Sequence, residues 1–100
     1  MIFVTVGTHE QPFNRLVKKV DELVSEGAIN EKVIIQTGFS TYIPRHCEVH
    51  KMMSFDEMQE NLKNARIVIT HGGPSSFIEA LQFRKVPIVV PRQEKFHEHV

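Results

Sequence analysis

The sequence contains a single cysteine and no excess of either charge. The first shortage excludes an internal disulfide, and the second excludes a strong long-range electrostatic field. Cys47 has no second cysteine in the chain to pair with, which excludes an internal disulfide and fits a reducing compartment. We interpret Cys47 as a bystander thiol rather than a nucleophile. The 12 basic residues balance the 12 acidic ones, so no long-range field attracts nucleic acid or an anionic membrane. Any bound anion must therefore be held by local geometry, and we expect no nucleic-acid partner.

Long apolar runs and several familiar ligand motifs are also missing. The opening run, residues 1–7, lacks a basic leader and is far shorter than the roughly 20 residues that a membrane-spanning helix requires, and no later run approaches that length. We therefore expect a soluble, cytoplasmic protein. The sequence has no Gly-x-Gly-x-x-Gly after its first apolar run and no Gly-x-x-x-x-Gly-Lys phosphate loop. These absences disfavour a nicotinamide-dinucleotide enzyme and a P-loop nucleotidase.

Short apolar runs alternate with amphipathic segments along the chain. A helix is expected at residues 13–24, where apolar residues recur at spacings of three and four, and Gly27 ends it. A second helix is expected to begin after Ser54, because Ser54 and Glu57 have the spacing of a capping box. A third helix is expected at about residues 75–83. Strands are expected at residues 1–6, 33–36, 49–53, 67–70 and 86–90.

The strands are apolar on both faces, which predicts a parallel sheet with helices on both sides. We expect a doubly wound α/β fold of about five strands in the order 3-2-1-4-5, so that the order reverses between the first and fourth strands. One hundred residues suffice for one domain with one core, and we assign residues 1–100 to it. No helix follows the fifth strand, which would leave a sheet edge bare, so we expect the sequence to be part of a longer protein.

Two loops with unusual sequences are expected to meet where the strand order reverses. Open parallel sheets bind ligands beyond the carboxyl ends of their strands at this point, and the loops there are residues 7–11 and 71–75. Gly72 and Gly73 allow a ligand to approach the backbone closely. The fixed φ angle of Pro74 suits the first turn of a helix. Free N–H groups at a helix start form a phosphate site. The alternative is that the segment is only a turn from strand to helix.

Three side chains near these loops allow two interpretations each. Glu79 lies one helical turn beyond the glycines and could accept hydrogen bonds from a ribose, but Ser76 and Glu79 also have capping-box spacing. His9 and His71 could each donate a hydrogen bond to a pyrophosphate or act as a general base. Either histidine could equally be bonded to the backbone of its own loop.

One cluster late in the sequence contains potential metal ligands. His97, Glu98 and His99 follow one another, with Glu94 nearby. On a strand His97 and His99 would share a face, but structural and catalytic metals normally take three or four ligands from defined positions. We therefore predict no metal ion and no other cofactor.

Three segments together resemble one known family. They are residues 3–8 (FVTVGT), 69–76 (ITHGGPSS) and 86–93 (VPIVVPRQ). These segments look like the C-terminal domain of glycosyltransferase family 28, and especially like its small stand-alone members, such as subunits of capsular-polysaccharide galactosyltransferases and of the dolichol-linked N-acetylglucosaminyltransferase. The motifs occur in the family's order and the likeness covers the whole chain. It implies the Rossmann-like, donor-binding half of a two-domain glycosyltransferase.

The resemblance also implies roles for individual residues. The turn from Gly72 to Ser76 would hold the diphosphate of a sugar nucleotide, with Gly7 and Thr8 flanking the same phosphates. Glu79 matches the family's ribose-binding glutamate, and the segment from Met53 to Phe55 matches the backbone that reads uracil. Contacts to the transferred sugar would begin at residues 93 and 94. The expected substrate-binding residues are Gly7, Thr8, Met53, Phe55, His71, Gly72, Gly73, Ser75, Ser76, Glu79, Gln93 and Glu94.

The family's chemistry predicts an inverting hexosyltransferase. A hydroxyl of a lipid-linked saccharide would displace the diphosphate of a UDP-sugar, either UDP-galactose or UDP-N-acetylglucosamine, in polysaccharide or glycolipid synthesis. His9 is the candidate general base. The sequence contains no acceptor domain, and small members of the family pair with a membrane-anchored subunit that supplies one. We therefore expect such a partner, which would make the protein peripheral to the membrane.

Two other functions remain open at this point. The chain could be a non-catalytic donor-binding or regulatory module that works only with its partner. It could also be an unrelated nucleotide-binding α/β protein, which would respond equally to adenine and uracil nucleotides.

Overall fold

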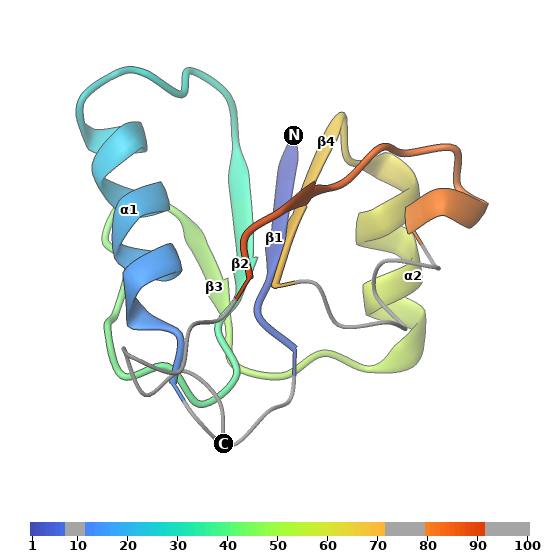
Figure 1. Cartoon of the computed structure of the whole chain (residues 1–100), viewed down its shortest axis with the longest axis horizontal. Coiled ribbons are helices and arrows are strands. Elements are labelled where there is room, and N and C mark those ends of the chain that lie inside the picture. The colour runs from blue at the N-terminus through green and yellow to red at the C-terminus, as the bar shows by residue number, and fades with distance from the viewer. Residues whose placement is uncertain (8–11, 72–79, 92–100) are drawn as a thin grey trace.

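The computed structural model describes residues 1–7, 12–71 and 80–91, and its centre is one parallel sheet (Figure 1). The sheet has five strands in the order β3-β2-β1-β4-β5, with every neighbouring pair parallel. This confirms the predicted doubly wound α/β fold and its strand order. The strands are β1 (Ile2–Thr5), β2 (Val33–Gln36), β3 (Glu48–His50), β4 (Ile67–Thr70) and β5 (Ile88–Val89).

Helices α1 (Asn14–Ser25) and α2 (Phe55–Asn64) lie on opposite faces of the sheet (Figure 1). Successive side chains of a strand point to opposite faces, so β1 contributes to two separate apolar clusters. Its Ile2 and Val4 pack with α1, whereas Phe3 packs with α2. All three are nearly or completely buried, which explains why the strand is apolar on both sides.

The ends of both helices follow local sequence signals. The N–H of Glu57 donates to Ser54 Oγ at 3.2 Å and the N–H of Ser54 donates to Glu57 Oε1 at 3.4 Å, which confirms the predicted capping box. Helix α1 ends at Ser25, and Gly27 follows with a φ of 80°, a conformation that glycine adopts readily.

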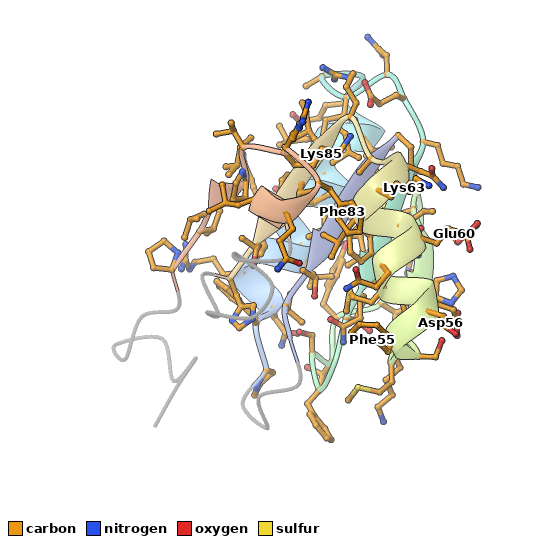
Figure 2. All side chains as sticks on the ribbon, turned by 90° about the vertical axis from the view of Figure 1, so that its right-hand side faces the viewer. Phe55, Asp56, Glu60, Lys63, Phe83 and Lys85 are labelled. Carbon is orange, nitrogen blue, oxygen red and sulfur yellow. The ribbon has the colours of Figure 1, made fainter. Side chains whose placement is uncertain are left out.

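Figure 2 shows the outer side of α2, where Asp56 and Glu60 point away from the sheet. Asp56 in the first turn and Lys63 in the last turn each carry the charge that complements the helix dipole. Phe83 packs beside α2 against the cluster that contains Phe3. In the described residues, no helix is long and apolar enough to cross a membrane.

Three predicted strands are shorter than expected. Strand β1 covers residues 2–5 rather than 1–6. Strand β3 covers residues 48–50 rather than 49–53, because the chain after Lys51 turns towards the cap of α2. Strand β5 covers only residues 88–89 rather than 86–90. Pro87 has no N–H to donate to a ladder, and Val86 before it is 85% exposed. Residues 80–82 are helical, as predicted, whereas residues 75–79 of that predicted helix lie outside the described chain.

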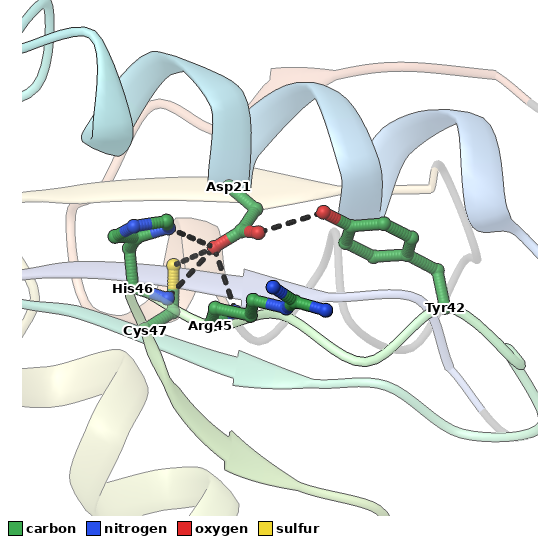
Figure 3. Close-up of polar contacts among 5 residues, drawn as sticks. All are labelled: Asp21, Tyr42, Arg45, His46 and Cys47. Carbon is green, nitrogen blue, oxygen red and sulfur yellow. Dashed lines mark hydrogen bonds and ion pairs between the residues drawn. The ribbon is translucent and has the colours of Figure 1, made fainter.

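A buried carboxylate fixes the long loop between β2 and β3 to helix α1 (Figure 3). The side chain of Asp21 is 4% exposed and accepts hydrogen bonds from the Tyr42 hydroxyl at 2.8 Å and from the backbone N–H groups of Arg45 and His46 at 3.0 and 2.8 Å. The ring Nδ1 of His46 lies 3.3 Å from the same carboxylate. Buried charges are tolerated only with such partners, so this cluster fixes the path of the loop.

The contacts around Asp21 shift the pKa values of Asp21 and Cys47. Burial raises the pKa of Asp21, but the hydrogen bonds from Tyr42 and from the backbone of His46 and Arg45 outweigh it and hold the pKa below the ordinary 3.8. Burial, with the nearby Asp21 charge, raises the pKa of the Cys47 thiol to about 11. The thiol is therefore protonated near neutral pH, which agrees with its interpretation as a bystander rather than a nucleophile.

We predict that Asp21→Ala lowers the free energy of unfolding by about 3 kcal/mol at pH 7, because it leaves buried donors unpaired. The pKa of Asp21 is lower in the folded state, so its contribution is complete above the unfolded value of 3.8 and is lost as the pH falls through the folded value. Urea unfolding should therefore show wild type and variant converging below about pH 4. Glu26→Ala, at an exposed carboxylate that ends the same helix, should have little effect. A difference that stays constant down to pH 3 would contradict this role.

Candidate functional site

The carboxyl ends of β1 and β4 lie side by side at the point where the strand order reverses. Thr5 pairs with Thr70 at the end of the register, and the N–H of His71 donates to the carbonyl of Thr5 at 3.3 Å. The chain leaving β1 continues to Gly7, and the chain leaving β4 continues to His71. The two loops that the sequence predicted to meet therefore begin next to each other, at the position where open parallel sheets bind ligands.

Gly7 and His71 are in direct contact, and the contact requires a glycine. Gly7 has a φ of 75°, in the left-handed region that other residues rarely adopt. A Cβ on Gly7 would lie 2.8 Å from His71 Cε1, closer than carbon atoms can pack, and 3.2 Å from Cδ2, which is tighter than most contacts. The backbone of one predicted loop thus lies against the imidazole of the other.

A buried glutamine that the sequence analysis did not single out holds the Gly7 turn. Gln36 ends β2 and is 1% exposed. Its Oε1 accepts hydrogen bonds from Thr5 Oγ1 at 2.7 Å and from the N–H of Gly7 at 3.2 Å, and its Nε2 donates to the carbonyl of Gly7 at 3.1 Å. The available signal was a polar residue at the end of the apolar run Val33–Gln36, since a buried polar side chain needs partners.

The predicted uracil-reading segment lies at the same end of the sheet. Gln36 Nε2 also donates to the carbonyl of Lys51 at 2.9 Å, two residues before Met53. Met53 is partly buried against the α2-side cluster, and Asn61 Nδ2 lies 3.6 Å from its sulfur. Phe55 begins α2 and is 71% exposed (Figure 2), so its side chain is open to solvent. Neither Met53 nor Phe55 therefore places a fully buried side chain at this end of the sheet.

Four predicted site residues are therefore located: Gly7, Met53, Phe55 and His71. The other predicted residues lie outside the described part of the chain, and so does the histidine cluster at residues 97–99. These other residues are Thr8, His9, Gly72, Gly73, Ser75, Ser76, Glu79, Gln93 and Glu94. Within residues 1–7, 12–71 and 80–91, no group of three or more histidine, cysteine, aspartate or glutamate side chains could hold a metal ion.

The described surface at this end combines one cation with exposed apolar groups. The Lys51 ammonium lies 5.7 Å from the centre of the Phe39 ring, within range of a cation–π contact. Phe39 is 45% exposed and Met52 is 43% exposed. A separate surface groove of about 680 Å³ lies between α1 and residues 41–46, and none of the predicted site residues lines it.

Comparisons with known proteins agree on one family and one fold. Residues 1–100 match the model of the glycosyltransferase family 28 C-terminal domain. The chain is similar to the UDP-N-acetylglucosamine transferase subunit ALG13 of Mus musculus, with 30% identity over 97% of the chain. It also superposes on the glycosyltransferase of kitacinnamycin (TM-score 0.68, 19% identity, 92% of the chain) and on SnogD from Streptomyces nogalater (TM-score 0.68, 20% identity, 91% of the chain).

The chain is much shorter than these relatives. It spans 9% of the length of the mouse protein and 24% and 25% of the two solved glycosyltransferases. The two solved structures are similar to this chain in fold. The family match covers every residue of the chain, including the segments that carry the resemblance. The protein therefore belongs to glycosyltransferase family 28, and its 100 residues correspond to the C-terminal domain of that family.

Proposed function

We propose that residues 1–100 form the donor-binding domain of a glycosyltransferase and that a UDP-sugar binds beyond the carboxyl ends of β1 and β4. The observation that carries this proposal is the contact between the Gly7 backbone and His71 at the reversal of strand order. His71 directly precedes the Gly72–Ser76 segment in the sequence. A diphosphate held by that segment would therefore lie close to the Gly7 turn.

The chemistry of the donor explains why such a site needs no net positive charge. Negative charge grows on the diphosphate as the sugar leaves, and fixed N–H groups aimed at it stabilise the transition state. Loss of one comparable donor in other enzymes costs about 3 kcal/mol in activation free energy. The protein has a formal net charge of zero, so backbone donors from Gly72 to Ser76 are the proposed source of this stabilisation.

The proposed reaction is an inverting displacement. A hydroxyl of a lipid-linked saccharide attacks the anomeric carbon, the bond to the diphosphate breaks, and a base accepts the hydroxyl proton. His9 is the proposed base, because it lies two residues after Gly7 in the same loop of the sequence. Glu79 is proposed to bind the ribose hydroxyls and residues 93 and 94 the transferred sugar, galactose or N-acetylglucosamine.

A partner subunit is part of the proposal. The mouse relative is itself named as a subunit of a transferase, which supports a divided enzyme. The proposed partner is membrane-anchored and binds the acceptor, and it would hold this protein at the cytoplasmic side of a membrane. The alternative function is a donor-binding or regulatory module without chemistry of its own, which binds UDP but leaves turnover to its partner.

We predict that the full-length protein binds UDP more tightly than ADP, and that Glu79→Ala weakens UDP binding about tenfold through lost hydrogen bonds to the ribose. Isothermal titration calorimetry measures both effects. Glu60→Ala is the matched control, because Glu60 points outward from α2 and is exposed. Equal affinity for ADP and UDP would contradict recognition of uracil at this site. UDP binding without any transferase activity in the assembled complex would favour the regulatory module.

We also predict that Gly7→Ala weakens UDP binding more than tenfold, because the new methyl group displaces His71 in addition to straining the turn. Gly27→Ala is a matched control. Gly27 has a similar φ of 80°, but a Cβ there would meet nothing within 4 Å. Both variants should lose about 1–2 kcal/mol of unfolding free energy in urea, from backbone strain. If the two variants bind UDP equally well, the Gly7–His71 contact is not part of the site.

A further inference from the structure

The buried side chain of Gln36 forms hydrogen bonds with two segments of the proposed site, one expected to contact phosphate and the other uracil. Gln36 bonds both backbone polar groups of Gly7, which lies on the phosphate side. It also bonds the carbonyl of Lys51, which leads into the Met53–Phe55 segment on the base side. Thr5 Oγ1 donates to the same amide at 2.7 Å. Thr5, Gly7, Gln36 and Lys51 are called the Gln36 network below.

The amide of Gln36 can satisfy these partners in one orientation only. The N–H of Gly7 must face an acceptor, whereas the carbonyls of Gly7 and Lys51 must face donors. A glutamine amide supplies one oxygen acceptor and two N–H donors, so Oε1 takes the N–H and Nε2 takes both carbonyls. Neither a carboxylate nor an apolar side chain of the same length can meet this requirement.

The residues after Gln36 tighten the same arrangement. The N–H of Gly38 donates to the carbonyl of Lys51 at 2.8 Å. Gly38 has a φ of 57°, and a Cβ on it would lie 2.6 Å from the carbonyl oxygen of Gly7. The ends of β1, β2 and β3 therefore pack closely around the Gln36 amide. At Gly38 the backbone approaches the Gly7 carbonyl so closely that a side chain would not fit.

We propose that Gln36 is a positioning residue of the donor site, which fixes the Gly7 turn and the Lys51–Met53 segment at one separation. The proposal rests on the proposed function, in which the first segment faces phosphate and the second faces uracil. Gln36 is 1% exposed, and it acts through its hydrogen bonds to these two segments and to the Thr5 hydroxyl. A UDP-sugar carries both a base and a diphosphate, so under this proposal it would contact both segments. Loss of the network should therefore reduce the extra affinity that the second phosphate provides.

The first test uses Gln36→Glu, which keeps the length of the side chain but replaces both N–H donors with an oxygen that repels the two carbonyls. UDP and UMP affinities are measured by calorimetry on the full-length protein. We expect the ratio of UDP affinity to UMP affinity to fall about tenfold. Asp21→Asn is the control, because Asp21 is an equally buried polar residue whose partners lie in residues 42–47, away from the predicted site. It should reduce stability but leave the ratio unchanged.

Thr5→Val is the milder second variant, in case Gln36→Glu does not fold. It keeps the shape of the side chain, removes only the hydrogen bonds of Thr5 Oγ1 to Gln36 and Gly7, and should lower the ratio in the same direction by about threefold. An unchanged ratio in both folded variants would overturn the positioning role.

A second measurement does not depend on nucleotide binding. Hydrogen exchange of the Gly7 amide, followed by NMR, should accelerate at least about tenfold in Gln36→Met, which removes the oxygen that accepts the Gly7 N–H, and stay unchanged in Asp21→Asn. Normal Gly7 protection in folded Gln36→Met would overturn the network itself. If the network behaves as expected but the unaltered protein does not bind UDP, the proposed function fails, and the positioning role falls with it.

Discussion

The positions of the strand ends at the candidate site depend on one buried amide, that of Gln36. Gln36 lies in an apolar interior with 1% of its surface exposed, where an unpaired polar group costs several kcal/mol. Its partners are backbone groups of Gly7 and Lys51 and the hydroxyl of Thr5, which lie at the ends of β1 and β3, while Gln36 itself ends β2. The amide can be buried only if all three strand ends take their observed positions, so the packing of the sheet and the shape of the turn are coupled.

Two layers of apolar packing hold the sheet that carries these strand ends. Alternating side chains of β1 and β2 form one cluster with α1 and another with α2. In the long connection from β2 to β3, Tyr42 and Cys47 pack against the α1-side cluster, whereas Phe39 and Ile43 are exposed. Asp21 adds hydrogen bonds to Tyr42, Arg45 and His46. Partial apolar packing and a buried carboxylate thus hold this connection together.

The proposed site belongs to a protein with a formal net charge of zero. Under the proposed function, such a protein attracts an anionic sugar nucleotide weakly at long range, so recognition would come from N–H groups held in fixed positions. Glycine at position 7 allows the backbone itself to lie against His71, and Gln36 fixes the orientation of that backbone. All of these contacts are made by groups that carry no net charge in the neutral forms of the amide and imidazole.

Several features could be predicted from the amino-acid sequence alone: the class of fold, the strand order, the capping box of α2 and the meeting of the Gly7 and His71 loops. These features follow from local patterns: apolar runs, helical spacing and the rule that ligands bind where strand order reverses. The burial of Asp21 and the hydrogen bonds of Gln36 became visible only in the folded chain. Their partners lie far away in the sequence, 29 residues from Gln36 to Gly7 and 21 from Asp21 to Tyr42, and no local pattern records such pairs.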